Sequence, residues 1–180
     1  MFPAIPDIEL WNAAVNGDRE AFGQLFRRHY SLLHQYGSKI CADRPTLEDC
    51  IQELFVELWQ KKKDTKVQFV KAYLLQALKY KLYKSFRDNK PAQSLESAEE
   101  PFEISHENFL IGQHDDSQKT AQVAEALNKL PPRQKEVIYL KIYKSLSYEE
   151  VGEVMGLNYQ VVRNLLCQAL KTFRKLLLPA

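Results

Sequence analysis

The sequence has few cysteines, few glycines and no long apolar run. Its three cysteines, Cys41, Cys50 and Cys167, are odd in number and lack C-x-x-C spacing, which argues against a disulfide framework or a zinc cluster. The four histidines stand at no ligand spacing to them, so neither a metal nor a cofactor is expected. No segment approaches the roughly 20 apolar residues of a spanning helix, and the N-terminus lacks a basic start. We therefore expect a protein of the reducing cytoplasm without membrane insertion.

Catalytic signatures are missing as well. The chain contains no P-loop, no G-x-S-x-G and no dinucleotide fingerprint. Glu53 and Glu57 fall on adjacent turns of one predicted helix, where two carboxylates cannot surround a substrate. We predict no catalytic residue and do not expect an enzyme.

The apolar pattern predicts an all-α protein of two small helical domains. Apolar residues make up 45% of the chain and recur at helical spacing, and only six glycines leave room for few tight turns. Asn16-Gly17-Asp18 should end a first helix, with Asp18 capping the next, and Thr46 should cap a third. A further helix is predicted over 69–87, and Pro131-Pro132 should separate a helix that ends at Leu130 from the helix over 132–145.

A long acidic stretch divides the two domains. Residues 88–118 carry eight carboxylates and one base, Lys90, and show no sustained periodicity. We predict a flexible linker there, with a short docking patch at 104–111, between domains spanning 7–87 and 119–178. Because the whole chain has a net charge of only +2, the parts that flank this linker are strongly basic.

Residues 146–173 have the pattern of a helix-turn-helix. Ser147 and Glu150 form a capping box for the first helix, Gly152 allows a close crossing, Gly156 ends the helix and Asn158 can cap the second. At about 100° per residue, the polar residues of the second helix fall within an arc of roughly 140°. They are Gln160, Arg163, Asn164, Cys167, Gln168, Lys171 and Arg174. Such a face can read a DNA major groove, and the alternative is an ordinary helical hairpin with a solvated basic face.

A row of carboxylates marks the predicted helix after Thr46. Asp49, Glu53 and Glu57 stack at i, i+4 and i+8, beside Gln52 and Gln60. Like charges at this spacing destabilise a helix by a few tenths of a kcal/mol per pair, so local stability does not explain the row. A basic partner surface would explain it. The alternative is a solvated acidic face that Lys61 partly neutralises.

The helix predicted over 69–87 combines rings and bases on one face. Its polar face carries Tyr73, Gln76, Tyr80, Tyr83, Lys84 and Arg87, opposite a leucine face. Rings stack on unpaired bases and cations follow phosphates, so this face suits single-stranded DNA. The alternative is that the tyrosines are half-buried packing residues.

Four blocks in order carry a family resemblance. They are DCIQELFVELW at 49–59, FVKAYLLQALK at 69–79, LPPRQKEV at 130–137 and LSYEEVGEVMG at 146–156. Together they resemble the extracytoplasmic-function (ECF) group of bacterial RNA polymerase sigma factors, over a span from about Ala13 to Leu177.

The resemblance implies sigma region 2, a linker and sigma region 4, with three sets of contact residues. Core RNA polymerase would contact Asp49, Gln52, Glu53 and Glu57. The single-stranded minus-ten element would contact Lys66, Phe69, Tyr73, Gln76, Tyr80, Tyr83, Lys84 and Arg87. The double-stranded minus-thirty-five element would contact Tyr159, Gln160, Arg163, Asn164, Gln168, Lys171 and Arg174. A separate anti-sigma factor is a further expected partner.

The chain departs from the family pattern in both DNA-contacting helices. Tyr73 and Tyr80 stand where the family usually has Trp and Asn. Leu165 and Gln168 stand where the recognition helix commonly carries bases, which predicts a shallower salt dependence and a distinct minus-thirty-five sequence. Two other interpretations remain open: a stand-alone helix-turn-helix regulator with an N-terminal sensor or interaction domain, and a decoy that binds polymerase without DNA.

Overall fold

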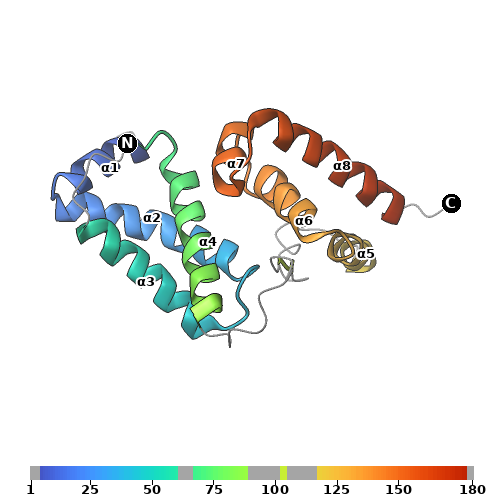
Figure 1. Ribbon diagram of the computed structural model, residues 1–180, viewed down its shortest axis with the longest axis horizontal. Coiled ribbons are helices and arrows are strands. Elements are labelled where there is room, and N and C mark those ends of the chain that lie inside the picture. Colours follow the sequence, from blue (N-terminus) through green and yellow to red (C-terminus); the bar gives the residue numbers. More distant parts are fainter. Residues whose placement is uncertain (1–4, 61–66, 89–101, 105–116, 178–180) are drawn as a thin grey trace. The chain divides into compact units, whose positions relative to one another are not determined.

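The computed structural model describes residues 5–60, 67–88, 102–104 and 117–177. Every secondary-structure element in those ranges is a helix, which confirms the all-α prediction. The chain divides into two compact units, residues 1–94 and 95–180 (Figure 1). None of the described helices is long and apolar enough to cross a membrane.

The first unit consists of α1 (Asp7–Val15), α2 (Arg19–Gly37), α3 (Arg44–Gln60) and α4 (Val70–Asp88). The helices α2, α3 and α4 pack against one another, and α1 contacts all three. Their apolar stripes meet in a core where Leu33, Ile51, Leu75 and Leu78 are completely buried. Each of the four helices therefore contacts the other three.

The start of α2 follows the prediction. Gly17 has φ +97°, a left-handed conformation that favours glycine, and so ends the first helical segment. The Asp18 carboxylate then accepts hydrogen bonds from the backbone N–H groups of Glu20 at 2.9 Å and Ala21 at 3.1 Å. Asp18 is thus the N-cap of α2.

The predicted cap of α3 was wrong. The helix begins at Arg44, three residues before its expected start, and the Asp43 carboxylate accepts a hydrogen bond from the Thr46 N–H at 3.0 Å. A carboxylate is at least as good a cap as a threonine hydroxyl. Pro45 fits inside the first turn, because its missing N–H would have had no helical partner there.

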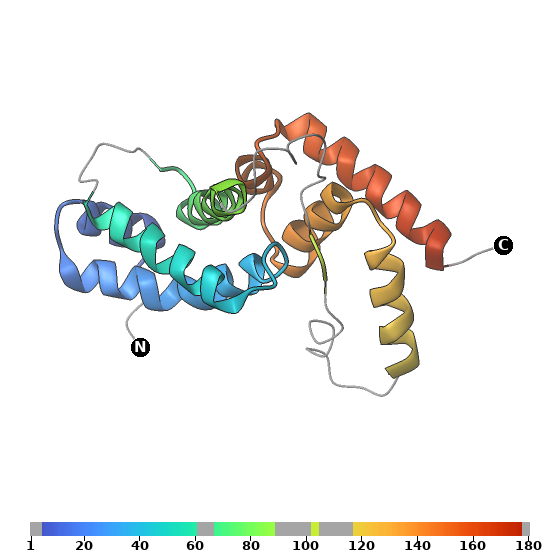
Figure 2. The same cartoon turned by 60° about the horizontal axis from the view of Figure 1, so that its bottom comes forward.

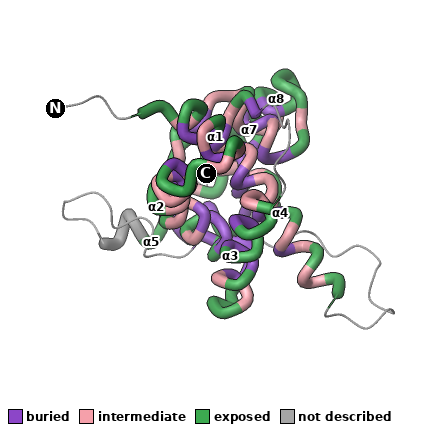
Figure 3. The backbone as a smooth tube through the Cα atoms, turned by 90° about the vertical axis from the view of Figure 1, so that its left-hand side faces the viewer, coloured by how far each residue is buried: buried purple, intermediate pink, exposed green. Residues whose placement is uncertain are grey.

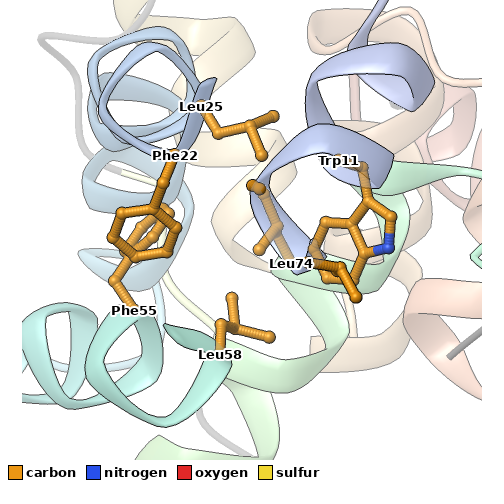
Figure 4. Close-up of a pocket in the computed structure, with 8 residues that line it drawn as sticks. Trp11, Phe22, Leu25, Phe55, Leu58 and Leu74 are labelled. Carbon is orange, nitrogen blue, oxygen red and sulfur yellow. The ribbon is translucent and has the colours of Figure 1, made fainter. Parts of the chain in front are cut away.

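Helix α1 is held to the bundle by an ion pair and by rings. Arg28 donates to the Asp7 carboxylate at 2.5 Å. His29 Nε2 lies 3.0 Å from the other carboxylate oxygen, and burial lowers the pKa of this imidazole. Further along, Trp11 meets the rings and leucines of α2, α3 and α4 around a small apolar pocket (Figure 4). Its neighbours there include Phe22, Phe55 and Leu74, so this pocket belongs to the core.

The second unit consists of α5 (Ser117–Asn128), α6 (Pro132–Ile138), a π-helix η2 (Tyr139–Tyr143), α7 (Tyr148–Met155) and α8 (Tyr159–Leu177). Helix α8 packs against α5, α6 and α7 (Figure 2). Pro132 occupies the first turn of α6, as predicted. The single helix predicted over 132–145 instead widens at Tyr139 and ends at Tyr143, where Lys144 N–H bonds to the carbonyl of Tyr139 at 3.1 Å.

Three residues of the predicted linker belong to the second unit. Phe102 is 2% exposed and Ile104 is 1% exposed, so both side chains are built into its core. Of the docking patch predicted at 104–111, Ile104 is thus packed in this core, together with Phe102 from outside the predicted patch. Residues 105–111 and the remainder of the predicted linker lie outside the described residues.

Candidate functional site

The capping box predicted for the helix-turn-helix is present. Glu150 donates its backbone N–H to the Ser147 hydroxyl at 3.1 Å, and Ser147 donates its own N–H to the Glu150 carboxylate at 2.7 Å. Helix α7 consequently begins at Tyr148. It ends at Gly156, which has φ +64° in the left-handed region.

Gly152 permits a close approach, although to a different neighbour from the expected one. A Cβ atom at this position would lie 2.6 Å from the carbonyl oxygen of Leu157 in the turn, whereas the nearest atom of α8, Val162 Cγ2, would be 3.8 Å away. Asn158 then accepts a hydrogen bond from the Val161 N–H at 2.9 Å. The predicted cap of α8 is confirmed, and the turn is tight because the carbonyl fills the space of a side chain.

Exposed and buried residues alternate along helix α8 (Figure 3), and its predicted polar face is exposed. Val162, Leu166 and Ala169 are buried on the opposite side. Every member of the predicted minus-thirty-five set is exposed: Tyr159, Gln160, Arg163, Asn164, Gln168, Lys171 and Arg174. The residues that helical periodicity assigns to the polar face are thus exposed along the whole helix.

Contacts along α8 orient the first part of this face. Gln160 donates to the Asn164 side-chain oxygen at 3.1 Å. The Arg163 guanidinium lies 5.8 Å from the centre of the Tyr159 ring, which in turn meets Tyr148 of α7 edge-on at 5.4 Å. A cation over a ring is partly pre-ordered, and its hydrogen-bond donors remain available to a base edge or phosphate.

The carboxylate row of α3 is also on the surface. Asp49, Gln52, Glu53 and Glu57 are all exposed. Val56 lies among them with 53% of its surface exposed, a feature that the charge pattern did not bring out. The row therefore combines charged groups with an apolar centre, as protein interfaces often do.

Lys81 of α4 bridges two members of this row. Its Nζ lies 2.9 Å from Glu53 Oε2 and 2.7 Å from Glu57 Oε1, and its side chain is only 14% exposed. Burial alone would lower the pKa of Lys81, but the hydrogen bonds to Glu57 and Glu53 outweigh it and hold that pKa above its usual value. The row is thus partly neutralised from α4. Lys61, the base expected to do this, lies outside the described residues.

The sequence analysis missed Lys81 because of its position on α4. It lies roughly 80° from Tyr73 on the helix, at the border between the polar and leucine faces, so periodicity assigns it to neither. Only the packing of α3 on α4 brings it to the carboxylates. A lysine at such a border, on the helix that follows an acidic row, is the sequence signal that could have predicted this contact.

A polar groove connects two of the predicted contact sets. From α3 it is lined by members of the carboxylate row, and from α4 by Lys84 of the aromatic-basic face. The full lining is Thr46, Asp49, Cys50, Glu53, Glu57, Lys81, Lys84, Ser85 and Asp88. Residues predicted to contact polymerase and residues predicted to contact the minus-ten element therefore share one surface depression.

The aromatic-basic face of α4 divides into an open part and a packed part. Tyr80 is 63% exposed, and Lys84 and Arg87 are exposed beside it. The other described members are half-buried: Phe69, Tyr73, Gln76 and Tyr83. Lys66 lies outside the described residues.

Tyr73 is the clearest packed member of that face. Its ring meets Trp11 of α1 edge-on, with centroids 5.2 Å apart. Burial, and then the negative charge of Glu57, raise the pKa of the Tyr73 hydroxyl. The packing alternative therefore holds in part for Tyr73, whereas Tyr80 is open to a partner.

The cysteines show no arrangement for metal binding or nucleophilic chemistry. Across the described ranges, no group of three or more His, Cys, Asp or Glu side chains is placed to hold a metal ion. Cys41 and Cys50 are buried, and burial raises the pKa of both thiols. Both therefore remain protonated and act as small core residues.

Family models match both units. The model of sigma-70 region 2 matches residues 25–91, and that of sigma-70 region 4 matches residues 120–173. Together they match more than half of the chain.

Named relatives agree with the family models. The chain is 38% identical to RNA polymerase sigma factor SigV of Bacillus subtilis over 66 residues, which are 37% of this chain and 40% of SigV. It is 24% identical to ECF RNA polymerase sigma factor BldN of Streptomyces coelicolor over 94% of this chain and 65% of BldN. The chain thus spans less than two thirds of the length of these two relatives.

A solved structure covers nearly the whole chain. In the structure of CnrH in complex with the cytosolic domain of CnrY, the sigma factor CnrH of Cupriavidus metallidurans is 26% identical to this chain. The alignment covers 95% of this chain and 96% of that one, with a TM-score of 0.64. The two units in their order, the two family models and these relatives agree. The chain belongs to the ECF group of sigma-70 family RNA polymerase sigma factors, which are non-catalytic transcription initiation factors.

Proposed function

We propose that this chain binds core RNA polymerase in the bacterial cytoplasm and directs it to promoters with minus-thirty-five and minus-ten elements, where it assists strand opening. The observation that carries the proposal is the coexistence, in one chain of this family, of a surface carboxylate row on α3 and a fully exposed polar face on α8. A stand-alone regulator would need only the second. The two domains would span 7–87 and 119–178.

The carboxylate row would dock on a basic surface of core polymerase. Asp49, Gln52, Glu53 and Glu57 would supply the polar contacts, and the exposed Val56 an apolar one. Lys81 lowers the net charge of the row. Its bridge to Glu53 and Glu57 also fixes two flexible carboxylates before docking, which reduces the entropy lost on binding.

The two DNA elements would be contacted by different helices in different ways. Tyr80, Lys84 and Arg87 would stack on and pair with the opened minus-ten strand, with Lys66, Phe69, Tyr73, Gln76 and Tyr83 beside them. The exposed face of α8, from Tyr159 to Arg174, would lie in the major groove of the minus-thirty-five element. Because CnrH is described in complex with the cytosolic domain of CnrY, we further propose a separate anti-sigma protein for this chain.

Run-off transcription with purified core polymerase tests the proposal. The template library is randomised in both promoter elements, and the variant is Asp49→Lys, since Asp49 belongs to the row but lies outside the Lys81 bridge. Glu9→Lys is the matched control, with the same charge change on an exposed residue of α1. We expect transcripts that require the protein, persist in the control and are lost in Asp49→Lys.

Two results would contradict the proposal. Binding of double-stranded DNA by the chain alone, without any protein-dependent transcript, would favour the stand-alone regulator. Transcripts that survive Asp49→Lys would show that polymerase is contacted elsewhere.

A further inference from the structure

The second unit holds a three-residue piece of the chain that precedes it. Residues 102–104 run in extended form against α5 and η2 (Figure 2). We call this contact, formed by Phe102, Glu103 and Ile104 with Asn128 and Tyr139, the linker clip. It joins the unit 14 residues after the last described residue of α4, Asp88.

Backbone pairing gives the linker clip a defined register. The Asn128 side chain donates its Nδ2 to the Ile104 carbonyl at 2.9 Å and accepts the Ile104 N–H on its Oδ1 at 3.2 Å. One amide side chain thus satisfies both backbone groups of one residue, as a neighbouring β-strand would. A slip by one residue would break both bonds and move apolar side chains out of the core.

Two buried apolar side chains anchor the linker clip, one on the paired residue Ile104 and one on Phe102 before it. Phe102 packs against the ring of Tyr139 at 5.6 Å between centroids, and both Phe102 and Ile104 are almost completely buried. Between them, the charge of Glu103 acts on Lys135 of α6: burial lowers the pKa of Lys135, and Glu103 partly offsets that effect. Opening the linker clip would expose two large apolar side chains and remove from a buried lysine the negative charge that raises its pKa.

The position of the linker clip limits how far apart the two units can move. A chain spans at most about 3.3 to 3.6 Å per residue, so Asp88 and Phe102 cannot be separated by more than roughly 50 Å. If the second unit began only at Ser117, the limit between Asp88 and Ser117 would be roughly 100 Å. The linker clip therefore halves the reach of the linker.

We propose that the linker clip sets the longest promoter spacer that this sigma factor accepts, by limiting the reach between its two DNA-contacting units. The inference rests on the proposed function, because only a protein that holds both elements at once is restricted by that reach. Each added base pair separates the elements by about 3.4 Å along the duplex. One fully extended linker residue therefore spans about the same distance as one base pair of spacer.

A matched pair of deletions in the full-length protein tests the proposal. Deleting 92–95 (AQSL) removes roughly 14 Å of reach before the linker clip, whereas deleting 111–114 (IGQH) removes the same length behind it. Neither deletion removes a carboxylate, a lysine or an arginine. The deletion of 111–114 removes one histidine. Eight residues remain between Ile104 and Ser117 after the second deletion, with a maximum span of roughly 30 Å, which exceeds the roughly 18 Å length of α5.

Transcription is measured with core polymerase on promoters whose spacer grows one base pair at a time. We expect the deletion of 92–95 to lower transcription at least tenfold on the longest spacers that the wild type uses, with little change on the shortest. The deletion of 111–114 should stay within twofold of wild type throughout. Adding Phe102→Ser and Asn128→Leu to the first deletion should restore the long spacers.

Amide hydrogen exchange provides the independent readout of the linker clip. The Ile104 N–H should be protected in the wild type and in both deletions, and should exchange freely in the variant with Phe102→Ser and Asn128→Leu. Identical spacer profiles for the two deletions, or an unprotected Ile104 in the wild type, would overturn the inference alone. A wild type that transcribes from no spacer would overturn the proposed function itself.

Discussion

Helices α4 and α8 are both 19 residues long with a polar face, but only α8 leaves that face open. Helix α8 packs along one side, and its predicted contact residues are all exposed. Helix α4 packs against α1, α2 and α3 and buries seven residues where α8 buries three, and half of its polar face, Tyr73, Gln76 and Tyr83, is half-buried. In a small bundle, a polar stripe on a helix with few buried residues predicts a binding surface directly, whereas one on a more deeply buried helix also serves the fold.

Substitutions of Tyr80 and Tyr73 should most strongly separate the binding role of the α4 polar face from its packing role. Tyr80→Ala should reduce promoter opening by roughly 5- to 150-fold, the equivalent of losing about 1 to 3 kcal/mol of base stacking. Its stability should be within about 0.5 kcal/mol of wild type, because the ring is exposed. Tyr73→Ala should instead lower the free energy of unfolding by about 2 kcal/mol, since it removes the contact with Trp11.

Open-complex formation and thermal unfolding, measured on both variants, check this pair. Equal losses of stability for Tyr80→Ala and Tyr73→Ala would show that the face is not divided in the way described.

On the exposed face of α8, substitution by alanine should weaken DNA binding without lowering the stability of the fold. Arg163→Ala should weaken use of the minus-thirty-five element by about 1 to 3 kcal/mol and relax its sequence preference at one position. Arg133→Ala, the same substitution at an exposed residue of α6 outside the predicted set, is the matched control. Transcription from promoters with single base changes measures both, and equal behaviour of the two variants would contradict the assigned face.

The turn between α7 and α8 should be the least tolerant point of the second unit. In Gly152→Ala the new Cβ would meet the Leu157 carbonyl oxygen at 2.6 Å, so we expect a loss of about 1 to 3 kcal/mol. Gly23→Ala in α2 should instead stabilise the first unit by about 0.5 to 1 kcal/mol, because its Cβ meets only the mobile end of Arg27. Hydrogen exchange of α7 and α2 follows each unit separately. A Gly152→Ala variant as stable as the wild type would contradict this expectation.

The smallest effect is expected from the bridge across α3 and α4. Lys81→Met keeps the length of the buried stem and removes the charge, so the free energy of unfolding should fall by about 0.5 to 1 kcal/mol. The loss should shrink at high salt, since Glu53 and Glu57 are largely exposed. Unfolding of wild type and variant at low and high salt measures this, and a salt-independent loss would point to packing instead of charge.

Local features of the fold could be predicted from the sequence because neighbouring residues determine them. The caps at Asp18, Ser147 and Asn158 each involve a bond over two or three residues, and all three are present. The failure at Thr46 was also local: Asp43 offered a better acceptor just before Pro45. The face of α8 was predictable because its neighbours occupy one side.

The features that were missed depend on residues far apart in the chain. Lys81 reaches Glu53 across 28 positions, and Asn128 holds Ile104 across 24. Neither contact leaves a periodic signal, since each depends on how two elements pack. The apolar pair Phe102 and Ile104 inside an acidic stretch was the one available hint of the linker clip.

The most direct test of a sigma factor that acts through both units is strand opening itself. A fluorescent adenine analogue, 2-aminopurine, is placed in the minus-ten element of a promoter selected by the transcription library, and its fluorescence is followed as components are added. We predict a rise only when core polymerase and this protein are both present, with no rise for Asp49→Lys. Duplex binding by the protein alone, with no rise when core polymerase is added, would contradict the assignment.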